Sequence, residues 1–325
     1  MICFVLILLS PAAVSAGEAE PELAPLAMKL DAGKVLKYAW TITSSQASKG
    51  QELGNAVDLK TEKSQRMSLF LQGEKAPQLG AIQLLLRFRD LSFEETSESP
   101  GPLKTSLKVD NRRIYETENE KVIIDSMNDI GLDKITDYQL KLRGMEVTAV
   151  RLILDAMGKQ QKVEGEKALV DAVHGGNAQS LFPVLANRRV APGESWDDRF
   201  DAPTMGDLKL DEPARMNSRI RFAKWVEQGG KKLAQLELIS AWESRDLKGK
   251  NQQNLNVLIT KLDGRGVGTC LFDPAESKFV DGEMTFFIKY HIHGARDEGS
   301  TDLDVDGKTR FTFKWEPGGL PAQGE

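Results

Sequence analysis

The amino-acid sequence predicts a mainly β protein with a minor helical share, built as two similar antiparallel units with curved sheets or open barrels. Three observations support this prediction. Apolar and polar residues alternate with a period of two, turns rich in glycine and proline separate the alternating stretches, and one hairpin-like motif occurs in each half. Such a pattern is typical of antiparallel sheets, and a short helical segment is expected to join the two units.

The N-terminal residues predict export. Residues 1–16 form an apolar run that is too short to span a bilayer, and Val14 and Ala16 precede Gly17 as the small residues of a cleavage site do. We therefore expect a signal peptide and a periplasmic or extracellular protein. The alternative is a buried N-terminal strand or helix. Residues 17–29 are acidic and contain proline, which predicts a flexible leader.

Composition excludes several classes of protein. The chain of 325 residues can bury a large core, and a net charge of −5 without a basic stripe argues against a nucleic-acid partner. Cys270 is the only cysteine after the predicted cleavage, and its apolar neighbours predict a small buried side chain rather than a nucleophile. No later apolar run reaches the length of a transmembrane segment, so none is expected in the mature chain.

The first β unit is expected over residues 30–166. Strands are predicted at Val35–Thr43, Gln65–Leu71 and Ala81–Phe93, where apolar residues alternate with polar ones. The polar, aperiodic stretch Ser44–Lys63 is interpreted as a loop or flap. The stretch Lys121–Leu142 is ambiguous. Its apolar residues have helical spacing, but Gly131 interrupts them, so a helix over the whole stretch is not assigned.

A helical linker is predicted over 167–192, a second β unit over 193–316 and a tail over 317–325. The apolar spacing changes to that of a helix in the linker, and Pro192-Gly193 then marks a turn, with Trp196 as the anchor of the second unit. The strands predicted there are Met216–Glu227, Lys232–Glu243, Leu255–Leu262, Thr269–Asp273, Glu283–His293 and Arg310–Trp315.

The motif common to both halves is Gly144–Gly165 and its counterpart Gly268–Gly282. Each contains an apolar strand that ends in an aspartate, Asp155 or Asp273, followed by a polar turn and a Val-(Glu/Asp)-Gly trio. A pair of aspartates could form a two-lobed acid dyad, but hydroxyl and glycine neighbours that would orient them are missing. We interpret both as turn residues of a closing hairpin.

Several of these motifs together resemble a family of exported bacterial β-rich proteins. They are "LRGMEVTAVRLILDAMGKQQKVEG", the turn "VAPGESW" and "GVGTCLFDPAESKFVDGEM", which cover roughly residues 140–283. The resemblance implies an exported β protein with a signal peptide, and it implies no reaction. A looser similarity of architecture links the chain to the open-barrel lipoprotein carriers of the bacterial envelope.

Asp302, Asp304 and Asp306 give the best candidate for a metal site. Asp302–Gly307 matches the D-x-D-x-D-G opening of a calcium loop, in which alternate carboxylates converge on the ion. The position of the bidentate glutamate is occupied by Phe313, and the flanks are predicted strands. The alternative is an acidic hairpin loop, so calcium is a weak hypothesis and no other cofactor is expected.

Other sequence patterns give weaker indications of a metal, phosphate or catalytic site. His291 and His293 lie two residues apart on a predicted strand and could form half of a transition-metal site, but Lys289 shares their face and His174 is distant in sequence. Gly264–Gly268 precedes a strand rather than a helix, so we interpret it as a turn and not as a phosphate loop. No G-x-S-x-G motif is present to suggest Ser/His/Asp catalysis.

The predicted function follows from the apolar face of the sheets. Large apolar residues recur with a period of two and are expected to form the concave core of the sheets rather than a ligand box: Trp40, Leu84–Leu86, Trp225, Phe286 and Tyr290. If the sheets curve without closing, the same face would line an apolar cleft. We expect an exported, non-catalytic protein that binds an apolar ligand or an envelope partner in that hollow. The alternatives are an interaction module without a small ligand and an exported hydrolase.

Overall fold

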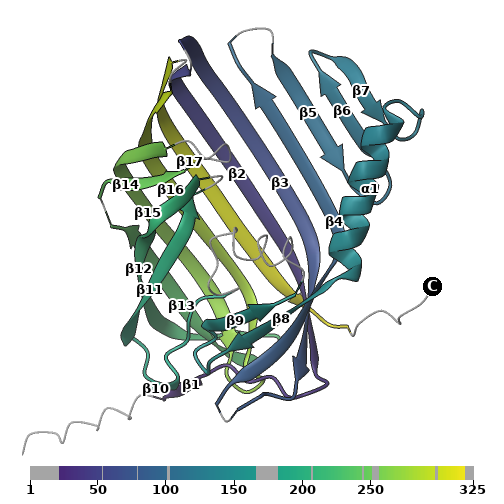
Figure 1. The fold of residues 1–325 in the computed structure, drawn as a ribbon. Helices are drawn as coiled ribbons and strands as arrows, with labels where there is room; N and C mark the ends of the chain where they lie inside the picture. Colours follow the sequence, from purple (N-terminus) through teal and green to yellow (C-terminus); the bar gives the residue numbers. More distant parts are fainter. Residues whose placement is uncertain are drawn as a thin grey trace, which may run out of the picture.

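The computed structural model describes residues 22–52, 54–78, 80–100, 103–165, 182–205, 208–243, 245–250, 256–296 and 299–318. Its main feature is one 15-stranded antiparallel sheet, which curves strongly (Figure 1). The prediction of a mainly β chain with curved antiparallel sheets is confirmed. The predicted signal peptide, the tail from residue 319 onward and residues 167–181 of the predicted helical linker lie outside the described residues.

The elements, in chain order, are β1 (Ala24–Leu26), β2 (Val35–Glu52), β3 (Asn55–Glu74), β4 (Ile82–Glu98), β5 (Lys104–Val109), β6 (Ile114–Glu118), β7 (Lys121–Asp125), α1 (Leu132–Val147), β8 (Ala149–Leu154), β9 (Gln160–Glu164), β10 (Arg188–Val190), β11 (Ser195–Met205), β12 (Leu208–Gln228), β13 (Lys231–Trp242), β14 (Leu247–Lys250), β15 (Asn256–Asp273), β16 (Lys278–Arg296) and β17 (Gly299–Glu316).

Strand order explains how the two halves meet. The strands follow one another as β11-β12-β13-β15-β16-β17-β2-β3-β4-β5-β6-β7, with β14 beside β12 and β15, and with β8 and β9 extending from β4. The last strand, β17, pairs with β2 from Thr301 opposite Glu52 to Glu316 opposite Lys37. The predicted units 30–166 and 193–316 therefore contribute to a single continuous sheet rather than to two separate ones. In Figure 1, β2, β3, β16 and β17 form its back and the flanking strands curve forward on both sides.

The main core lies at the lower end of the curved sheet. Alternate residues of β2, β3 and β4 point inward there, among them Tyr38, Leu69 and Leu84, and all three side chains are buried. Phe182 inserts between these strands and β16, with its ring stacked 4.9 Å from that of Phe279. The part of the predicted helical linker that the structure describes, 182–192, thus contributes a core residue and the strand β10, with no helix.

The flexible leader predicted over 17–29 is wrong for its described part. Ala24 and Leu26 have no exposed surface, and β1 pairs with β10 to form a two-stranded sheet below the main core. The Met28 amide donates a hydrogen bond to the carbonyl of Ala156, 2.9 Å away. Acidic and proline residues flank this short apolar segment, and burial of its two apolar side chains outweighs the local preference for a loop.

Glycines on the inner face of β15 allow side chains of the neighbouring strands to pack closely against its backbone. A Cβ atom at Gly266 would lie 2.6 Å from Cδ1 of Phe286, and one at Gly268 would lie 2.7 Å from Cγ of Met284. The stretch Gly264–Gly268, predicted as a turn, therefore belongs to the interior of β15. Its alternate glycines make room for large side chains of the adjacent strands.

The stretch Ser44–Lys63, predicted as a loop, instead completes a long hairpin. Strands β2 and β3 pair without interruption from Val35 opposite Gln72 to Glu52 opposite Asn55. Beyond the core this hairpin is polar on both faces, and cross-strand pairs such as Lys49–Asp58 replace apolar contacts. Backbone pairing with β17 on one side and β4 on the other extends the strands past the apolar pattern.

The ambiguous stretch 121–142 divides between a strand and a helix. Gly131 adopts a left-handed conformation with φ of 74° between β7 and α1, which explains why the periodic pattern breaks there. Helix α1 buries Ile135 against a small cluster formed by Val109, Ile114 and Ile124. Of the helices in the described residues, none combines the length and the apolar character needed to cross a membrane.

Candidate functional site

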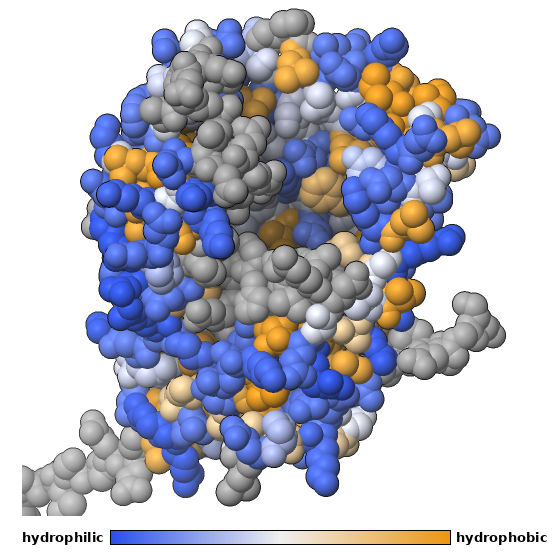
Figure 2. Space-filling model, in the orientation of Figure 1, coloured by the Kyte–Doolittle hydropathy of each residue, from blue (hydrophilic) through white to orange (hydrophobic). Residues whose placement is uncertain are grey.

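An apolar row along β16 faces the inside of the curved sheet. Its members alternate on one face of the strand and are half-buried, and they pack against two separate buried clusters. The row consists of Met284, Phe286, Ile288, Tyr290 and Ile292. The residues between them, such as Lys289 and Thr285, point to the outer face. Figure 2 shows the molecule hollowed between the two walls, with apolar side chains visible in its depth.

The opposite wall of this hollow is formed by α1 and the strands beneath it. Leu142 of α1 packs against both the main core and the small cluster under the helix, and Tyr138, Phe93 and Leu107 are half-buried beside that cluster. Burial raises the pKa of the Tyr138 phenol, which stays neutral over the physiological range. Both walls therefore present apolar side chains that their own clusters cover only in part.

A polar strip crosses the inner face between the two walls. Alternation from Trp40 and Met67 places Lys63 of β3 and Glu95 of β4 on the inner face, where their charged atoms lie 3.2 Å apart. One row further from the core, the hydroxyls of Thr61 and Ser97 are 3.2 Å apart. The inner face is thus apolar at its base and along β16, and polar toward the far ends of β2, β3 and β4.

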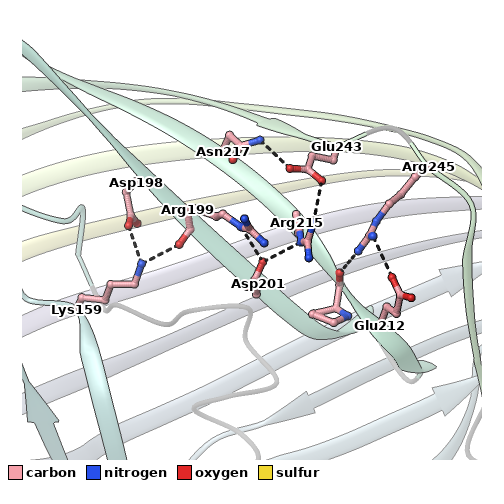
Figure 3. A network of polar contacts seen from close by, with 10 residues as sticks. Lys159, Asp198, Arg199, Asp201, Glu212, Arg215, Asn217, Glu243 and Arg245 are labelled. Carbon is pink, nitrogen blue, oxygen red and sulfur yellow. Dashed lines mark hydrogen bonds and ion pairs between the residues drawn. The ribbon is translucent and has the colours of Figure 1, made fainter.

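The lower rim of the hollow is closed by a contact between distant parts of the sheet. Lys159, in the turn between β8 and β9, donates hydrogen bonds of 2.8 Å to Oδ1 of Asp198 and to the carbonyl of Arg199, both in β11 (Figure 3). Since β8 extends from β4 and β11 is the opposite end of the strand order, this lysine links the two sides of the curved sheet. Trp196 of β11 also docks here, because its indole donates to the carbonyl of Val184 at 2.8 Å.

The arginines beside this contact form a balanced network rather than an anion site. Asp201 lies 3.3 Å from Arg199 and 3.7 Å from Arg215, and Glu212 lies 3.1 Å from Arg245 (Figure 3). Each guanidinium has a carboxylate neighbour, so the cluster has no excess of positive charge to attract an anion. Its ion pairs link β12 to β11 and to the segment after β13.

The three aspartates of the calcium hypothesis lie within β17 rather than in a loop. Asp302, Asp304 and Asp306 point to the same outer face, and each lies opposite a cationic or ionisable side chain of β16. Asp306 is 2.8 Å from Lys289 and Asp304 is 3.0 Å from Nδ1 of His291. A strand within a sheet does not fold carboxylates around an ion as a loop does. Calcium binding itself stays a prediction, which a titration of thermal stability with calcium can test.

The histidine pair was correctly placed on one face of a strand. His291 and His293 project from the outer face of β16, and Asp302 lies 3.3 Å from both. His174 lies outside the described residues. Within the part of the chain that the structure describes, no group of three or more histidine, cysteine or acidic side chains has an arrangement that could hold a metal. Cys270 is buried and free, as predicted, and burial raises the pKa of its thiol.

Asp155 and Asp273 are turn residues, as the sequence indicates. Oδ1 of Asp155 accepts hydrogen bonds of 2.9 Å from the amides of Met157 and Lys159, and Oδ1 of Asp273 accepts bonds of 3.0 Å from those of Ala275 and Glu276. Each carboxylate therefore stabilises the turn of a hairpin, β8–β9 or β15–β16.

The turn between β15 and β16 also contains an ionic cluster. Lys278 is only 2% exposed, and its ammonium lies 2.7 Å from Glu276 and 3.2 Å from the centre of the Trp315 ring. Lys231 pairs with Glu276 from the other side. Hydrogen bonds from Lys231 and then from Lys278 lower the pKa of Glu276 from 4.5 to about 2.

The lowered pKa of Glu276 predicts a pH-dependent contribution to stability. A carboxyl group whose pKa is lower in the folded state stabilises the fold above its unfolded pKa, and this contribution is lost as the pH falls from 4.5 toward 2. We expect Glu276→Gln to lower the melting temperature at pH 7, and the gap between variant and wild type to narrow steadily below pH 4.5. Thermal unfolding by circular dichroism between pH 7 and roughly pH 2.5 measures this. A gap that stays constant over that range would contradict the assignment.

Comparisons with known proteins give a broad similarity of fold and no family. No family model matches the sequence, and no curated protein matches it. The family resemblance proposed from the sequence motifs therefore stays a prediction. Among solved structures, a chain titled "Lipid-protein interactions in lipovitellin" is 11% identical with a TM-score of 0.45, over 91% of this chain and 26% of that one. The present chain thus spans about a quarter of that protein.

Two bacterial structures have lower TM-scores than lipovitellin. The β domain of the Bordetella autotransporter Brka is 11% identical with a TM-score of 0.25, over 87% of this chain and all of that one. OccK7 of Pseudomonas aeruginosa is 7% identical with a TM-score of 0.21, over 88% of this chain and all of that one. All three structures are rich in β-strands. Since similarities of this size carry no functional argument, the function must be inferred from the residues of this chain.

Proposed function

We propose that this chain is an exported, non-catalytic protein that binds an amphipathic ligand with an extended apolar part in the hollow of its sheet. The supporting observation is the row on β16 from Met284 to Ile292, five apolar side chains that face the hollow and are only half-buried. Leaving the other half of such an apolar row in contact with water is costly, because each large side chain contributes about 1.5–3 kcal/mol when it is fully buried. A bound alkyl chain would supply that burial.

The polar strip suggests why the ligand would be amphipathic rather than purely apolar. The Lys63–Glu95 pair and the Thr61–Ser97 hydroxyls lie on the same inner face, further from the core than the apolar base. The register through β2 and β17 puts Lys63 level with Phe286 and Thr61 level with Ile288, so these donors and acceptors lie beside the apolar row, where a ligand lying across the strands would place its head group. The fold contains curved, antiparallel sheet on three sides of this space, which is the arrangement that a ligand cavity requires.

A binding assay with a fluorescent polyunsaturated fatty acid, cis-parinaric acid, tests this function. We expect the wild-type chain to bind it and Ile288→Glu to weaken binding at least about tenfold, because the new carboxylate would be buried against the alkyl chain without a partner. Thr285→Glu places the same charge on the outer face of the same strand and should leave binding unchanged.

The two variants separate function from folding. Circular dichroism and melting temperature establish that both are folded before affinities are compared. No binding by the wild type, or an equal loss in both variants, would contradict a ligand site in the hollow and would favour the interaction module without a small ligand. No observation favours the hydrolase, since the described histidines lie on the outer face.

A further inference from the structure

A second, polar groove lies on the outer face of the sheet, away from the hollow. It has a volume of about 460 Å³ and crosses four neighbouring strands, β17, β2, β3 and β4. Its lining consists of Thr43, Ser44, Ser45, Glu62, Lys63, Ser64, Glu94, Glu95, Thr96, Lys308 and Arg310.

Strand alternation assigns this groove to the outer face. Trp40 and Ile42 of β2 belong to the inner face, so Thr43 and Ser45 point outward. On β17 only Lys308 and Arg310 line the groove, and these positions pair with Ser45 and Thr43. Ser44, Lys63 and Glu95 point their side chains inward, and we infer that they contribute backbone to the floor. The groove and the hollow are therefore separated by the thickness of the sheet.

The charges in the groove are ordered across the strands. Lys308 and Arg310 line it on β17, hydroxyls follow on β2, and Glu62 and Glu94 line it on β3 and β4. Adjacent strands are about 4.8 Å apart, so the cationic and acidic sides are separated by roughly 10–14 Å. This length and the volume suit a small, extended polar molecule rather than a single ion.

Among the residues that the structure describes, one cation in the groove has no acidic partner. Arg310 pairs with Glu283 at 2.6 Å, Glu94 with Lys108 at 3.2 Å and Glu62 with Lys60 at 2.7 Å. Among the described residues Lys308 forms no ion pair, and its ammonium lies 5.6 Å from the centre of the Phe287 ring on the same face. It is thus available to bind an anionic group beside an aromatic surface.

We propose that this groove binds an acidic saccharide, a polyol that carries one anionic group. Lys308 would bind the anionic group by a charge-assisted hydrogen bond. The hydroxyls of Thr43, Ser45, Ser64 and Thr96 can each donate and accept, and the carboxylates of Glu62 and Glu94 accept from sugar hydroxyls. A cation at one end, hydroxyls in the middle and acceptors at the other end match that ligand class along its length.

Isothermal titration calorimetry with glucuronate tests the proposal. Glucose, which has the hydroxyls but no charge, and acetate, which has the carboxylate but no hydroxyls, serve as comparison ligands. We expect glucuronate to bind in the millimolar range and glucose and acetate to bind at least about tenfold more weakly, because each lacks one set of contacts. Lys308→Gln should weaken glucuronate binding about tenfold. Lys314→Gln is the matched control, because Lys314 lies on the same outer face of β17 but outside the groove, and should have no effect.

The outcomes are distinct. Absence of glucuronate binding, or equal affinity of wild type and Lys308→Gln, would overturn the proposal. Acetate binding as tight as glucuronate binding would show a charge-only site and would overturn the saccharide class. An equal loss in Lys314→Gln would show unspecific attraction to the basic strand.

Thr96→Val, which removes one hydroxyl without a change of charge, should weaken glucuronate binding and leave the fatty-acid assay of the hollow unaffected.

Discussion

Replacing Phe313 with alanine is expected to destabilise the fold by about 3–5 kcal/mol. The side chain is 1% exposed, and its ring lies 5.0 Å from that of Phe182 and 5.6 Å from that of Trp40. Since β17 joins the first and last parts of the chain, the cavity would form where the two halves meet. The surrounding rings belong to three different segments, β2, the segment of Phe182 and β16, and cannot all move inward to fill it, which favours the upper part of the range. Urea unfolding followed by tryptophan fluorescence measures the loss.

Phe287→Ala is the control for this prediction. That ring lies half-buried on the outer face of β16, with the Arg265 guanidinium and the Lys308 ammonium each 5.6 Å from its centre, and its removal opens no internal cavity. We expect a loss of less than about 1 kcal/mol. Similar losses in the two variants would contradict the assignment of the aromatic cluster as the centre of the core. The urea dependence of the unfolding free energy should be equal in both, which excludes a change in the unfolded state.

The features that the sequence predicted well depend on local patterns. Alternation over Glu283–His293 correctly separates the inner residues Phe286 and Tyr290 from the outer histidines. The aspartates at 155 and 273 bind the amides of their own turns, so their role can be inferred from the neighbouring residues alone. The apolar half of the candidate site was therefore predictable, because one strand carries it in a regular repeat.

The features that were missed depend on contacts between distant segments. Residues 44–63 have no apolar repeat, and they form strands because β17 and β4 pair with them over most of their length. Both the polar strip around Lys63 and the outer groove around Ser45 involve this hairpin, so neither could be inferred while it was interpreted as a loop. The short strand β1 was missed for the same reason, since its partner β10 is more than a hundred and fifty residues away.

The glycine pattern of β15 shows how one sequence can predict opposite local structures. Gly264, Gly266 and Gly268 alternate with exposed residues, which in isolation is typical of a turn. In the sheet the same residues are tightly packed because Trp242, Phe286 and Met284 of neighbouring strands occupy the space of their missing side chains. A glycine repeat with a period of two inside an apolar region is better interpreted as a closely covered strand face.

This interpretation predicts a strong effect for Gly282→Ala, in the strand next to β15. A Cβ atom there would lie 2.7 Å from Cε1 of Phe313 and 2.8 Å from Cβ of Cys270, in a fully packed region. Gly282 does not have a positive φ, so the cost is steric rather than conformational. We expect a loss of about 1–3 kcal/mol in urea unfolding. Gly144→Ala in α1, where a Cβ atom would meet nothing within 4 Å apart from the neighbouring helix backbone, should instead stabilise by about 0.5–1 kcal/mol.

A double-mutant cycle then separates the clash from other causes. Phe313→Leu removes the part of the ring that meets the new Cβ atom, so Gly282→Ala should cost less in that background than in the wild type. The expected coupling is about 0.5–3 kcal/mol, with the double variant more stable than the sum of the single losses predicts. Strict additivity would mean that the glycine is required for another reason, such as the backbone path of β16. Coupling would show that Gly282 and Phe313 are complementary in size, and that this pair fixes the spacing of β16 and β17 below the apolar row that faces the hollow.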